Sequence, residues 1–556
     1  MVSGEAAGTV AEAFIPQFLI RLLQLLPRHI SIFALIIICL IAFLTIAFLS
    51  DQIFEHVPHS EDEVAYIFQA KVFAQNRLTA PTPRYRQAFW TPFVVDYQGQ
   101  RFGKYPPGWP ALLSLGGRLN APWLINALLA AVTLALIAWL GRCFYKKDLR
   151  GLPKEHLGLW AAGLGLMTPG FLFLSSSFLS HTASLFWSTL ALVALFYITA
   201  GTRLTLLALL TGLFLGAAFI TRPFAGVGIG LTAGIFLLAL ALRREIHGEI
   251  LLWLALGGLT ISALLPLYWW AITGDPLFNT YLLVWPYDRL GFGPNIGPYG
   301  YTLADAIFIN TRLKLAALAT GLFGWPGWSN VLFLPIPFLA RRANRWDWLL
   351  LATILSLIFV HIFYWAFGGT DGGFPRYYYD ALPAFLLLTV RGIQISGEIL
   401  ADWQKSVPLP ERATEGRVGE GQTPSPTLPL EGGGRSRLRW LPVGVVTVFI
   451  AYNLIWNLPP LLAAQKGKYG ITAAQLQVIE RADLSKPALV IVKNVEKWSD
   501  FAAPFAANSP TLDGPVVYAS DEGPELTQKL REEFKDRVCW ELDGEKLEPC
   551  QQVGSR

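Results

Sequence analysis

The stretch that decides the fold is IFALIIICLIAFLTIAFL, residues 32–49, which contains no charged side chain. As a helix that rises about 1.5 Å per residue, this stretch nearly crosses the roughly 30 Å hydrocarbon core of a bilayer. A cleaved signal peptide would place a shorter apolar region nearer the first residue and follow it with small residues, and neither feature is present. We therefore expect a transmembrane helix that the protein retains.

Apolar runs of this kind recur along the chain. Of its 556 residues, 53% are hydrophobic and 15% are charged, which is more apolar surface than one soluble core of this length would contain. The composition predicts a polytopic α-helical membrane protein. About eleven transmembrane helices are expected, near residues 31–50, 122–141, 157–176, 182–200, 204–220, 224–242, 249–271, 315–340, 347–367, 379–395 and 438–457.

Basic residues indicate which side of the membrane each loop occupies. If every apolar run crosses once, the short basic loops share one side, which the positive-inside rule identifies as the cytoplasm. These loops contain Arg142, Lys146, Lys147 and Arg150; Arg203; Arg243 and Arg244; and Arg341, Arg342 and Arg345. The net charge is only +5 and the basic residues lie between apolar runs, so nucleic-acid binding has no support.

Segments outside the apolar runs complete the expected organisation. Residues 1–30 have a mixed apolar and arginine periodicity, typical either of a helix on the cytoplasmic membrane surface or of an extension of the first span. Residues 31–395 are expected to form the main transmembrane domain, with a first outer loop at 51–121. Residues 396–437 are rich in Pro, Gly and Ser, which predicts a disordered cytoplasmic linker before the last span at 438–457.

The tail, residues 458–556, is expected to be a small extracytoplasmic α/β domain. PALVIVKN and GPVVYAS are typical of strands, ELTQKLREEF of a helix and VCWELDGEKLEPC of a hairpin. The Asp-Gly turn of the hairpin would bring Cys539 close to Cys550, which favours a disulfide in an oxidising compartment. The remaining cysteines, Cys39 and Cys143, lie in or beside membrane helices.

The first outer loop carries the acidic cluster Glu61, Asp62 and Glu63. Ser60 followed three residues later by Glu63 fits a capping box that opens an amphipathic helix. The cluster is either a solvated helix cap or a source of a catalytic base, and both can hold because a helix can direct its first acids at a substrate. With His59 it also offers metal ligands, although the spacing matches no metal signature, so metal dependence stays open.

The same loop ends in RFGKYPPGWPALL, residues 101–113. Pro106 and Pro107 force an extended, stiff backbone just before the chain enters the membrane again, so Lys104 is held near the interface. A lysine in this position is either a snorkelling anchor or a cation directed at a substrate.

Together these two motifs resemble the GT-C membrane glycosyltransferases, most nearly the dolichyl-phosphate-mannose protein mannosyltransferases and the aminoarabinose transferase of lipid A. The resemblance covers roughly residues 31–395 and rests on the acidic pair before a Tyr-containing helix and on the Pro-Pro turn into the second span. It implies transfer of a sugar from a polyprenyl-phosphate carrier. It also implies that Asp62 is the catalytic base or an acceptor-orienting group, with Glu63 as its neighbour.

Cations on the same face would hold the donor phosphate as it departs. Arg222 in ITRPF and Arg376 in GGTDGGFPRYYYDALP each lie at a predicted outer helix end, where an arginine either binds phosphate through its fork or simply avoids the bilayer. The pair Arg376 and Tyr377 resembles a late element of the family whose arginine holds the lipid-linked phosphate. Lys104 is a weaker match, because the family's cation usually precedes the prolines directly and here Tyr105 intervenes.

One position departs from the family. His181, in SFLSHTASLFW, stands where relatives often have an acid at the start of their fourth helix. It contacts the carrier phosphate or acceptor, binds a metal, or caps its helix. His181, Tyr377 and Tyr105 are therefore candidate substrate contacts. The segment WPYDRLGFGPNIGPYGYT, residues 285–302, either lines a carrier or acceptor groove or forms an aromatic belt at the interface.

Absent motifs narrow the function further. The sequence contains no GxxxxGK[ST] loop, and the glycines at 226–234 lie inside an apolar span with no strand before them, so no nucleotide site is visible. We expect a multi-pass glycosyltransferase of the plasma (inner) membrane that transfers a hexose or pentose, with inversion, to an extracytoplasmic lipid, glycan or protein. A transporter or lipid flippase is the alternative, and a scaffold protein is a third. Charges gathered on one face, without paired half-repeats, favour chemistry at one interface over transport.

Overall fold

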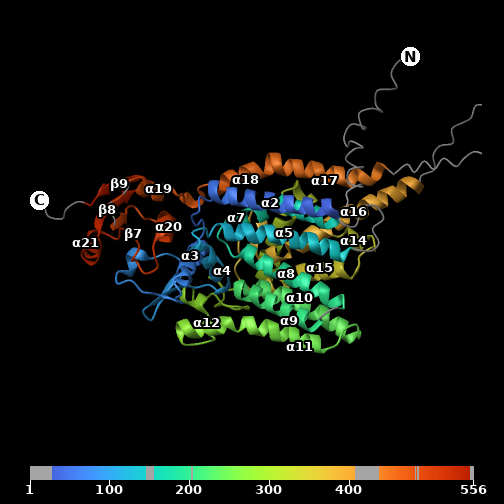
Figure 1. The fold of residues 1–556 in the computed structure, drawn as a ribbon, viewed down its shortest axis with the longest axis horizontal. Helices are drawn as coiled ribbons and strands as arrows, with labels where there is room; N and C mark the ends of the chain where they lie inside the picture. The colour runs from blue at the N-terminus through green and yellow to red at the C-terminus, as the bar shows by residue number, and fades with distance from the viewer. Residues whose placement is uncertain are drawn as a thin grey trace, which may run out of the picture.

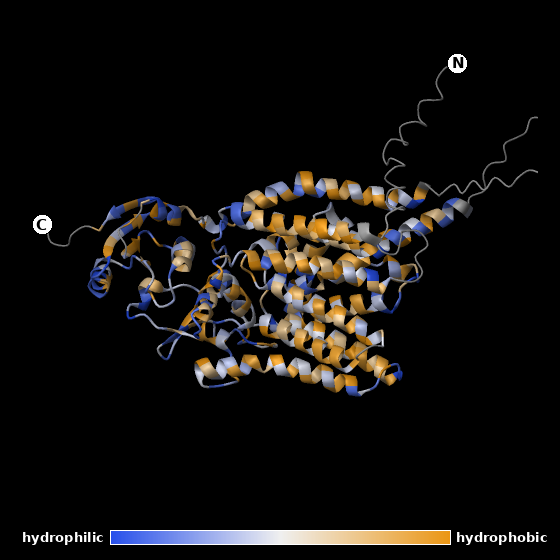
Figure 2. Ribbon diagram, in the orientation of Figure 1, coloured by the Kyte–Doolittle hydropathy of each residue, from blue (hydrophilic) through white to orange (hydrophobic). Residues whose placement is uncertain are grey.

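The computed structural model describes residues 28–145, 156–201, 204–406, 437–482, 484 and 487–550. Most of them form a bundle of long helices that run alongside one another, and a smaller part with a β-sheet lies at one end of the bundle (Figure 1). Apolar residues dominate the bundle, whereas hydrophilic residues are more frequent in the part with the sheet (Figure 2). We call the end of the bundle next to this sheet the sheet end, and the opposite one the far end.

Nine helices in the described part of the chain are long and apolar enough to cross a membrane, or ten if one bent pair counts as a single span. The chain is therefore a multi-pass membrane protein. The spans are α2 (Arg28–Gln52), α5 (Leu124–Phe144), α8 (His181–Thr199), α9 (Leu204–Thr221), α10 (Pro223–Leu242), α11 (Glu249–Ser262) with α12 (Leu264–Thr273), α15 (Arg345–Ile362), η6 (Arg376–Ala381) with α16 (Leu382–Ser406), and the run of η7 (Arg437–Trp440), α17 (Leu441–Tyr452), η8 (Asn453–Asn457), α18 (Leu458–Gln465) and η9 (Lys468–Gly470).

Two predicted spans are not single helices, so the expected number of eleven is too high for the described residues. The run at 157–176 forms α6 (His156–Leu166) and α7 (Pro169–Ser176), bent by 65° where Pro169 starts a new helix. The run at 315–340 is broken by prolines and by left-handed glycines such as Gly324, with φ +69°. This region contains η4 (Asp305–Thr311), α13 (Arg312–Gly321), η5 (Gly327–Val331) and α14 (Ile336–Leu339).

Two predicted segments fall largely outside the described residues. The N-terminal segment 1–30 is described only from Arg28 onward. The predicted linker 396–437 begins inside α16, which continues to Ser406 because EILADWQKS at 398–406 contains good helix formers and no proline. The prediction of disorder is therefore wrong for the start of this segment, and its remainder up to residue 436 is not described.

Close packing of α9 on α11 fixes the start of α10. A Cβ atom on Gly212 would come within 2.1 Å of the Leu254 carbonyl oxygen, and one on Gly257 within 2.2 Å of the Leu209 carbonyl oxygen. Only glycine permits the two backbones to approach so closely. The short turn after α9 then places Arg222 at the N-terminus of α10.

The segment between α2 and α5 forms two α-helices, one short 3-10 helix and a small sheet. It contains α3 (Glu61–Ala74), η2 (Arg86–Phe89) and α4 (Gly108–Arg118), with antiparallel strands β1 (Ala80–Pro81), β2 (Val94–Tyr97) and β3 (Gln100–Gly103) in the order β1-β3-β2. The predicted cap of α3 is confirmed, since Ser60 Oγ accepts a hydrogen bond from the Glu63 amide at 3.4 Å. The Glu63 carboxylate accepts from the Ser60 hydroxyl at 2.8 Å.

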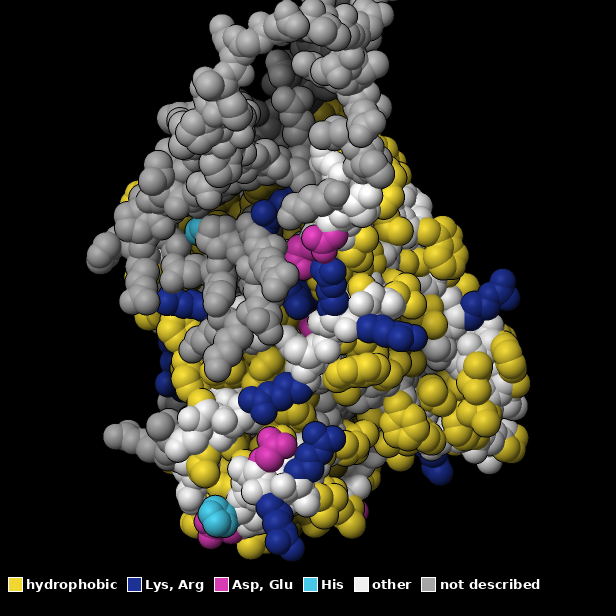
Figure 3. Space-filling model, turned by 90° about the vertical axis from the view of Figure 1, so that its right-hand side faces the viewer, with side chains coloured by type: hydrophobic (Ala, Val, Ile, Leu, Met, Phe, Trp, Pro, Cys, Tyr) yellow, Lys and Arg dark blue, Asp and Glu magenta, His cyan; other side chains and the backbone are white. Residues whose placement is uncertain are grey.

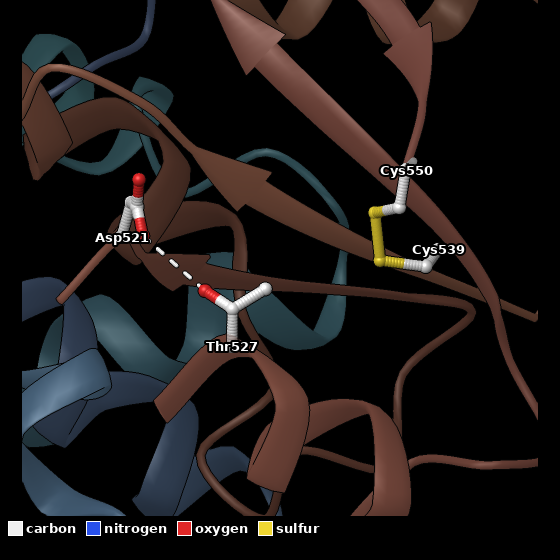
Figure 4. Close-up of a disulfide and its surroundings, with 4 residues drawn as sticks. All are labelled: Asp521, Thr527, Cys539 and Cys550. Carbon is white, nitrogen blue, oxygen red and sulfur yellow. Dashed lines mark hydrogen bonds between the residues drawn. A yellow bond between two sulfur atoms is a disulfide. The ribbon is translucent and has the colours of Figure 1, made fainter. Parts of the chain in front are cut away.

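The tail folds around a four-stranded sheet. Strands β6 (Ala488–Val492), β7 (Val516–Ser520), β8 (Val538–Asp543) and β9 (Lys546–Pro549) lie in the order β7-β6-β8-β9, accompanied by α19 (Ala474–Arg481), α20 (Trp498–Ala507) and α21 (Pro524–Glu533). The two predicted strands, the helix and the hairpin are confirmed. So is the disulfide between Cys539 and Cys550 (Figure 4). Beside it, the Thr527 hydroxyl donates to Asp521 at 3.2 Å and ties α21 to the end of β7.

Helix α3 connects the tail to the bundle. The ring of Phe68 packs on that of Phe505 in α20, with 5.9 Å between ring centroids. The Lys71 ammonium donates to the carbonyls of Ala506, Ala507 and Asn508 at 2.5, 3.2 and 3.1 Å. A cation there satisfies the free carbonyls at the end of α20. With the C-terminal ends of α3 and α20 fastened in this way, the first residues of both helices border one cavity.

The far end of the bundle carries basic side chains (Figure 3). Arg342 pairs there with Glu398 at 2.9 Å, and Arg345 lies 3.7 Å from Glu245. These residues belong to or adjoin the loops for which the sequence predicts a cytoplasmic position.

Candidate functional site

Helix ends at the sheet end enclose a cavity of about 510 Å³, which we call the first cavity. The beginnings of α3, α8, α10 and η6 and the turn before α4 meet at its wall. All of the predicted site residues except Glu63 line it, namely Asp62, Lys104, Tyr105, His181, Arg222, Arg376 and Tyr377.

Asp62 occupies the second position of α3, where the helix N-terminus favours a carboxylate. The Tyr105 hydroxyl donates a hydrogen bond to Asp62 Oδ1, and Arg376 Nη1 lies 3.5 Å from Oδ2. Burial and the charge of Asp62 raise the pKa of Tyr105 well above its usual value, so Tyr105 keeps the proton that it donates. The Asp62 side chain nevertheless remains 29% accessible. It is thus held in place and still open to a ligand.

Arg376 is shared between two carboxylates. It is the first residue of η6 and follows the two-stranded ribbon of β4 (Thr370–Asp371) and β5 (Phe374–Pro375). Its Nε lies 2.9 Å from Asp371 Oδ2, while its Nη1 faces Asp62. Asp371 in turn lies 3.6 Å from the Lys468 ammonium in η9. Because Nη2 has no hydrogen bond to a described residue, the guanidinium retains donors for a ligand.

Lys104 lies in an aromatic cage. Its Nζ is 3.6 Å from the ring centroid of Phe93, 4.4 Å from that of Trp285 and 5.1 Å from that of Tyr281. The residue is only 2% exposed, and its carbonyl accepts a hydrogen bond from the Thr280 hydroxyl at 2.6 Å. This burial lowers the pKa of the ammonium to about 8. A snorkelling anchor does not fit a side chain enclosed in this way.

Arg222 and His181 form a second basic group on the cavity wall. Arg222 Nη1 donates to His181 Nε2 at 2.6 Å, so the histidine proton resides on Nδ1. Both His181 Nδ1 and Arg222 Nε are buried and have no hydrogen-bond partner in the described part of the chain. His181 is the first residue of α8, but the cap position belongs to Ser180 and no side chain caps this helix, so the capping interpretation is wrong. The His181 ring instead orients Arg222. Unused donors at the wall suit an anionic ligand.

Tyr377 stacks on a histidine that the sequence analysis did not single out. Its ring lies 4.8 Å from that of His361, and the Arg222 guanidinium lies 5.9 Å from the Tyr377 centroid. Lys314 Nζ lies 5.0 Å from the same ring, and Lys314 is 1% exposed. In the sequence, His361 and Lys314 are single polar side chains in or beside an apolar run. A residue of this kind is easily interpreted as an anchor at the membrane interface.

Glu63 does not belong to the first cavity. It is 2% exposed, accepts a hydrogen bond from the Phe178 amide at 3.0 Å and bonds Ser60. Burial raises the pKa of its carboxyl to about 7, against the opposing effect of these hydrogen bonds. Glu63 therefore links α3 to the turn before α8, and its predicted catalytic role is not supported.

The predicted groove segment 285–302 contributes its first residues. Trp285 and Asp288 line the first cavity, as does Tyr281 of η3 (Thr280–Leu283) just before them. Tyr66, one turn after Asp62 on α3, lies on the same wall, and its hydroxyl is 3.1 Å from that of Ser180. The sequence signal for Asp288 was a single acid within the aromatic segment 285–302.

A second cavity, of about 560 Å³, lies between the first outer loop and the tail. Glu61, Asp62 and Arg376 line both cavities. The tail contributes Tyr469, Gly470, Lys497, Trp498, Ser499 and Asp500. Tyr469 is 61% exposed and has a left-handed backbone (φ +60°), which a non-glycine residue adopts only under strain and which recurs at ligand sites.

No group of three or more His, Cys, Asp and Glu side chains positioned to hold a metal ion occurs among the described residues. His59, the imidazole proposed to join the acidic cluster, donates its Nδ1 proton to the Val57 carbonyl at 3.0 Å. Its Nε2 is buried and has no partner in the described part of the chain.

No family model and no curated protein matches the sequence. Among solved structures, ArnT from Cupriavidus metallidurans bound to undecaprenyl phosphate is 13% identical over 91% of this chain and 89% of that chain, with a TM-score of 0.49. The archaeal oligosaccharyltransferase AglB from Archaeoglobus fulgidus, in complex with an inhibitory peptide and a dolichol-phosphate, is 13% identical over 86% of this chain and 64% of that chain, with a TM-score of 0.41. Both belong to the GT-C superfamily that the first-loop motifs resemble. A fold hosts many activities, so these likenesses assign no chemistry to the side chains of the two cavities.

Proposed function

We propose that this protein is a membrane glycosyltransferase that acts on the extracytoplasmic side of the plasma membrane. It transfers a hexose or pentose from a polyprenyl-phosphate donor to an acceptor hydroxyl group. The observation that carries the proposal is the position of Asp62 and Arg376, which line both cavities. A carboxylate and a phosphate-binding cation thereby stand between a site for each substrate. The basic far end supports the sidedness, because positive loops remain in the cytoplasm.

The first cavity suits the donor. Three cations, Lys104, Arg222 and Arg376, line it together with aromatic rings. A sugar linked to a polyprenyl phosphate is a phosphodiester with one negative charge, and the phosphate that departs carries up to two. Cations fixed around a departing phosphate stabilise this increase in charge.

Asp62 is the proposed base. The acceptor oxygen attacks the anomeric carbon of the donor while its proton passes to the Asp62 carboxylate, and the bond between that carbon and the phosphate oxygen breaks. The electron pair of this bond leaves with the phosphate. A single displacement of this kind inverts the anomeric carbon. The hydrogen bond from Tyr105 and the approach of Arg376 fix the orientation of the carboxylate.

The second cavity suits the acceptor. It shares Glu61, Asp62 and Arg376 with the first cavity, and its tail residues supply an aromatic pair, Tyr469 and Trp498, whose ring centroids lie 6.4 Å apart. Lys497 and Asp500 add polar groups at the start of α20. The tail thus has a role in acceptor binding. The hydrogen bonds from Lys71 attach α20 to α3 and so fix the position of the tail residues relative to Asp62.

The test of the proposal is sugar transfer in vitro. Purified protein in vesicles is supplied with radiolabelled polyprenyl-phosphate sugars and with membrane acceptors, and labelled acceptor is counted. Labelled product above the protein-free blank supports the proposal. If another enzyme uses the same donors and acceptors and this protein does not, while it moves labelled lipid between leaflets, the flippase alternative replaces it.

The pH dependence of donor binding provides a prediction for Lys104. Its pKa of about 8 means that the ammonium is present in the free protein below pH 8 and is lost as the pH rises through that value. Only the charged form attracts the donor phosphate, and binding raises the pKa. The KM for the donor should therefore increase above pH 8, by up to about tenfold per pH unit. Steady-state kinetics from pH 6.5 to 9.5 measures this increase.

The matched variant for this prediction is Lys104→Arg. A guanidinium remains charged throughout this pH range, so the alkaline increase in KM should disappear while transfer persists. An unchanged increase in this variant would assign the titration to another group.

Acceptor binding provides a prediction for Trp498. Trp498→Ala should raise the KM for the acceptor about tenfold, because a stacked aromatic contact contributes ~1.5 kcal/mol, and should leave the KM for the donor unchanged. The control is Trp90→Ala, which removes a tryptophan that is 60% exposed in the first outer loop and lies outside both cavities. A parallel increase in both KM values for Trp498→Ala would indicate a displaced tail and contradict the prediction.

A further inference from the structure

One carboxylate oxygen in the first cavity is buried and unused. Asp288 is 3% exposed, and its Oδ1 accepts hydrogen bonds from the Tyr364 hydroxyl at 2.9 Å and from Trp365 Nε1 at 3.1 Å. Its Oδ2 has no hydrogen-bond partner in the described part of the chain. Asp288 also lines the first cavity. A buried charged oxygen without a partner is costly, so its retention calls for an explanation.

The surrounding structure fixes the position of this carboxylate. The Asp288 amide donates to the Trp285 carbonyl at 3.0 Å, and the Asn279 side chain donates to the Asp288 carbonyl at 3.3 Å. These two bonds fix the main chain of Asp288, and the two donors on Oδ1 fix its carboxylate. Oδ2 is therefore an acceptor in a fixed position, and a ligand in the cavity can donate a hydrogen bond to it.

The chemistry of the cavity decides which part of a ligand this acceptor meets. Asp288 repels the phosphate of the donor, which the cations Arg222 and Arg376 attract. The rings of Tyr281 and Trp285 line the same cavity and add apolar surface to its wall, and each also faces the Lys104 ammonium, at 5.1 and 4.4 Å from the ring centroids. A group that combines hydrogen-bond donors with an apolar ring face is a sugar. A hydroxyl or an ammonium group on that ring would satisfy Oδ2.

We propose that Asp288 recognises the donor sugar by accepting a hydrogen bond from a hydroxyl or ammonium group on its ring through Oδ2. This inference rests on the proposed function, since it concerns the sugar that the carrier brings. It divides the first cavity into a part around Arg222 and Arg376 that holds the phosphate and a part around Asp288 that selects the sugar. Lys104 is close enough to both Asp62 and Asp288 for its charge to interact with theirs. Asp288 is in this view a specificity-determining residue, and the base is Asp62.

The experiment compares ligands that differ only in the sugar. Binding of undecaprenyl phosphate, an undecaprenyl-phosphate hexose and an undecaprenyl-phosphate amino sugar is measured by tryptophan fluorescence for the wild type and for Asp288→Asn. An asparagine can still accept the two hydrogen bonds on Oδ1, but it presents an amide in place of Oδ2. The variant should bind the preferred sugar-loaded carrier at least about tenfold more weakly. Its affinity for bare undecaprenyl phosphate should be unchanged or slightly higher, because a negative charge is removed.

The control is Asp275→Asn, an exposed acid of the same outer segment that lies outside the cavity and accepts a hydrogen bond from the Leu277 amide at 2.9 Å. It should leave both affinities unchanged. Equal weakening of loaded and bare carrier in Asp288→Asn would mean that Asp288 only anchors Tyr364 and Trp365, and would overturn the inference. A wild type that binds every loaded carrier no better than the bare one would also overturn it. A wild type that binds none of the ligands would overturn the proposed function itself.

Discussion

Asp62→Asn is expected to reduce sugar transfer by about 10²- to 10⁴-fold, the usual contribution of a positioned general base. An asparagine retains the shape of the side chain and can accept the hydrogen bond from Tyr105, but it cannot take the proton of the acceptor hydroxyl. The loss should therefore appear in kcat. The KM for the donor and the thermal stability in detergent should change little. Initial rates with radiolabelled donor, together with a melting curve for each variant, measure these effects.

The adjacent acid provides a matched control. Glu63→Gln makes the same chemical change one residue further along α3, at a side chain that faces Phe178 and Ser60 instead of the first cavity. It should retain most of the activity, since a glutamine can accept the Phe178 hydrogen bond. Wild-type rates in Asp62→Asn would exclude Asp62 as the base. Glu61, which lines both cavities and whose pKa is raised by burial and by Asp62, would then be the next candidate.

Apolar runs predicted most of the bundle, and they failed where the backbone breaks. The mean hydropathy of a window of residues measures how apolar they are. It does not depend on whether the backbone can continue as a helix. In the run at 157–176 the break occurs at Pro169, and in the run at 315–340 it occurs around Gly324. The prolines and glycines of both runs were visible in the sequence. Their number alone does not locate a break, because Pro266 and Pro442 lie within spans that continue past them.

Local patterns predicted the outer elements well because short-range chemistry determines them. The cap at Ser60 and the hairpin that joins Cys539 to Cys550 both depend on residues close in sequence. Alternating the predicted spans across the membrane placed Asp62, Arg222 and Arg376 on the same side. In the structure all three line the first cavity. Alternation of the spans assigns residues to one face of the membrane, whereas their distances depend on how the helices pack.

The remainder of the site depends on directions and on long-range contacts that no local pattern contains. Asp62 and Glu63 are neighbours in sequence, but successive helical residues point about 100° apart, so one faces the cavity and the other faces the protein. The cage of Lys104 combines rings from segments far apart, including Phe93 and Trp285. Its assembly could be recognised only once the segments were positioned.

Arg376→Lys is expected to lower kcat/KM for the donor by about 10²-fold, in line with the removal of one preorganised donor from a developing anion. The lysine keeps the positive charge, but a single ammonium cannot face Asp62 and Asp371 and still present two donors to a phosphate. The variant should bind the donor more weakly in the ground state and should also stabilise the departing phosphate less. Titration with bare polyprenyl phosphate measures the first effect, and single-turnover transfer at saturating donor measures the second.

Two companion variants separate phosphate binding from loop structure. Asp371→Asn removes the charge that pairs with Arg376 and Lys468 but leaves the guanidinium in place, so it should reduce transfer less than Arg376→Lys does. Arg118→Lys makes the same arginine replacement at an exposed site on α4, where Arg118 bonds Asn76 at 2.6 Å, and should have no effect. If Asp371→Asn were as damaging as Arg376→Lys, the arginine would serve mainly to fold the β4–β5 ribbon. A larger loss in Arg376→Lys, with weakened binding of the bare carrier, would identify Arg376 as the residue that receives the phosphate when the sugar departs.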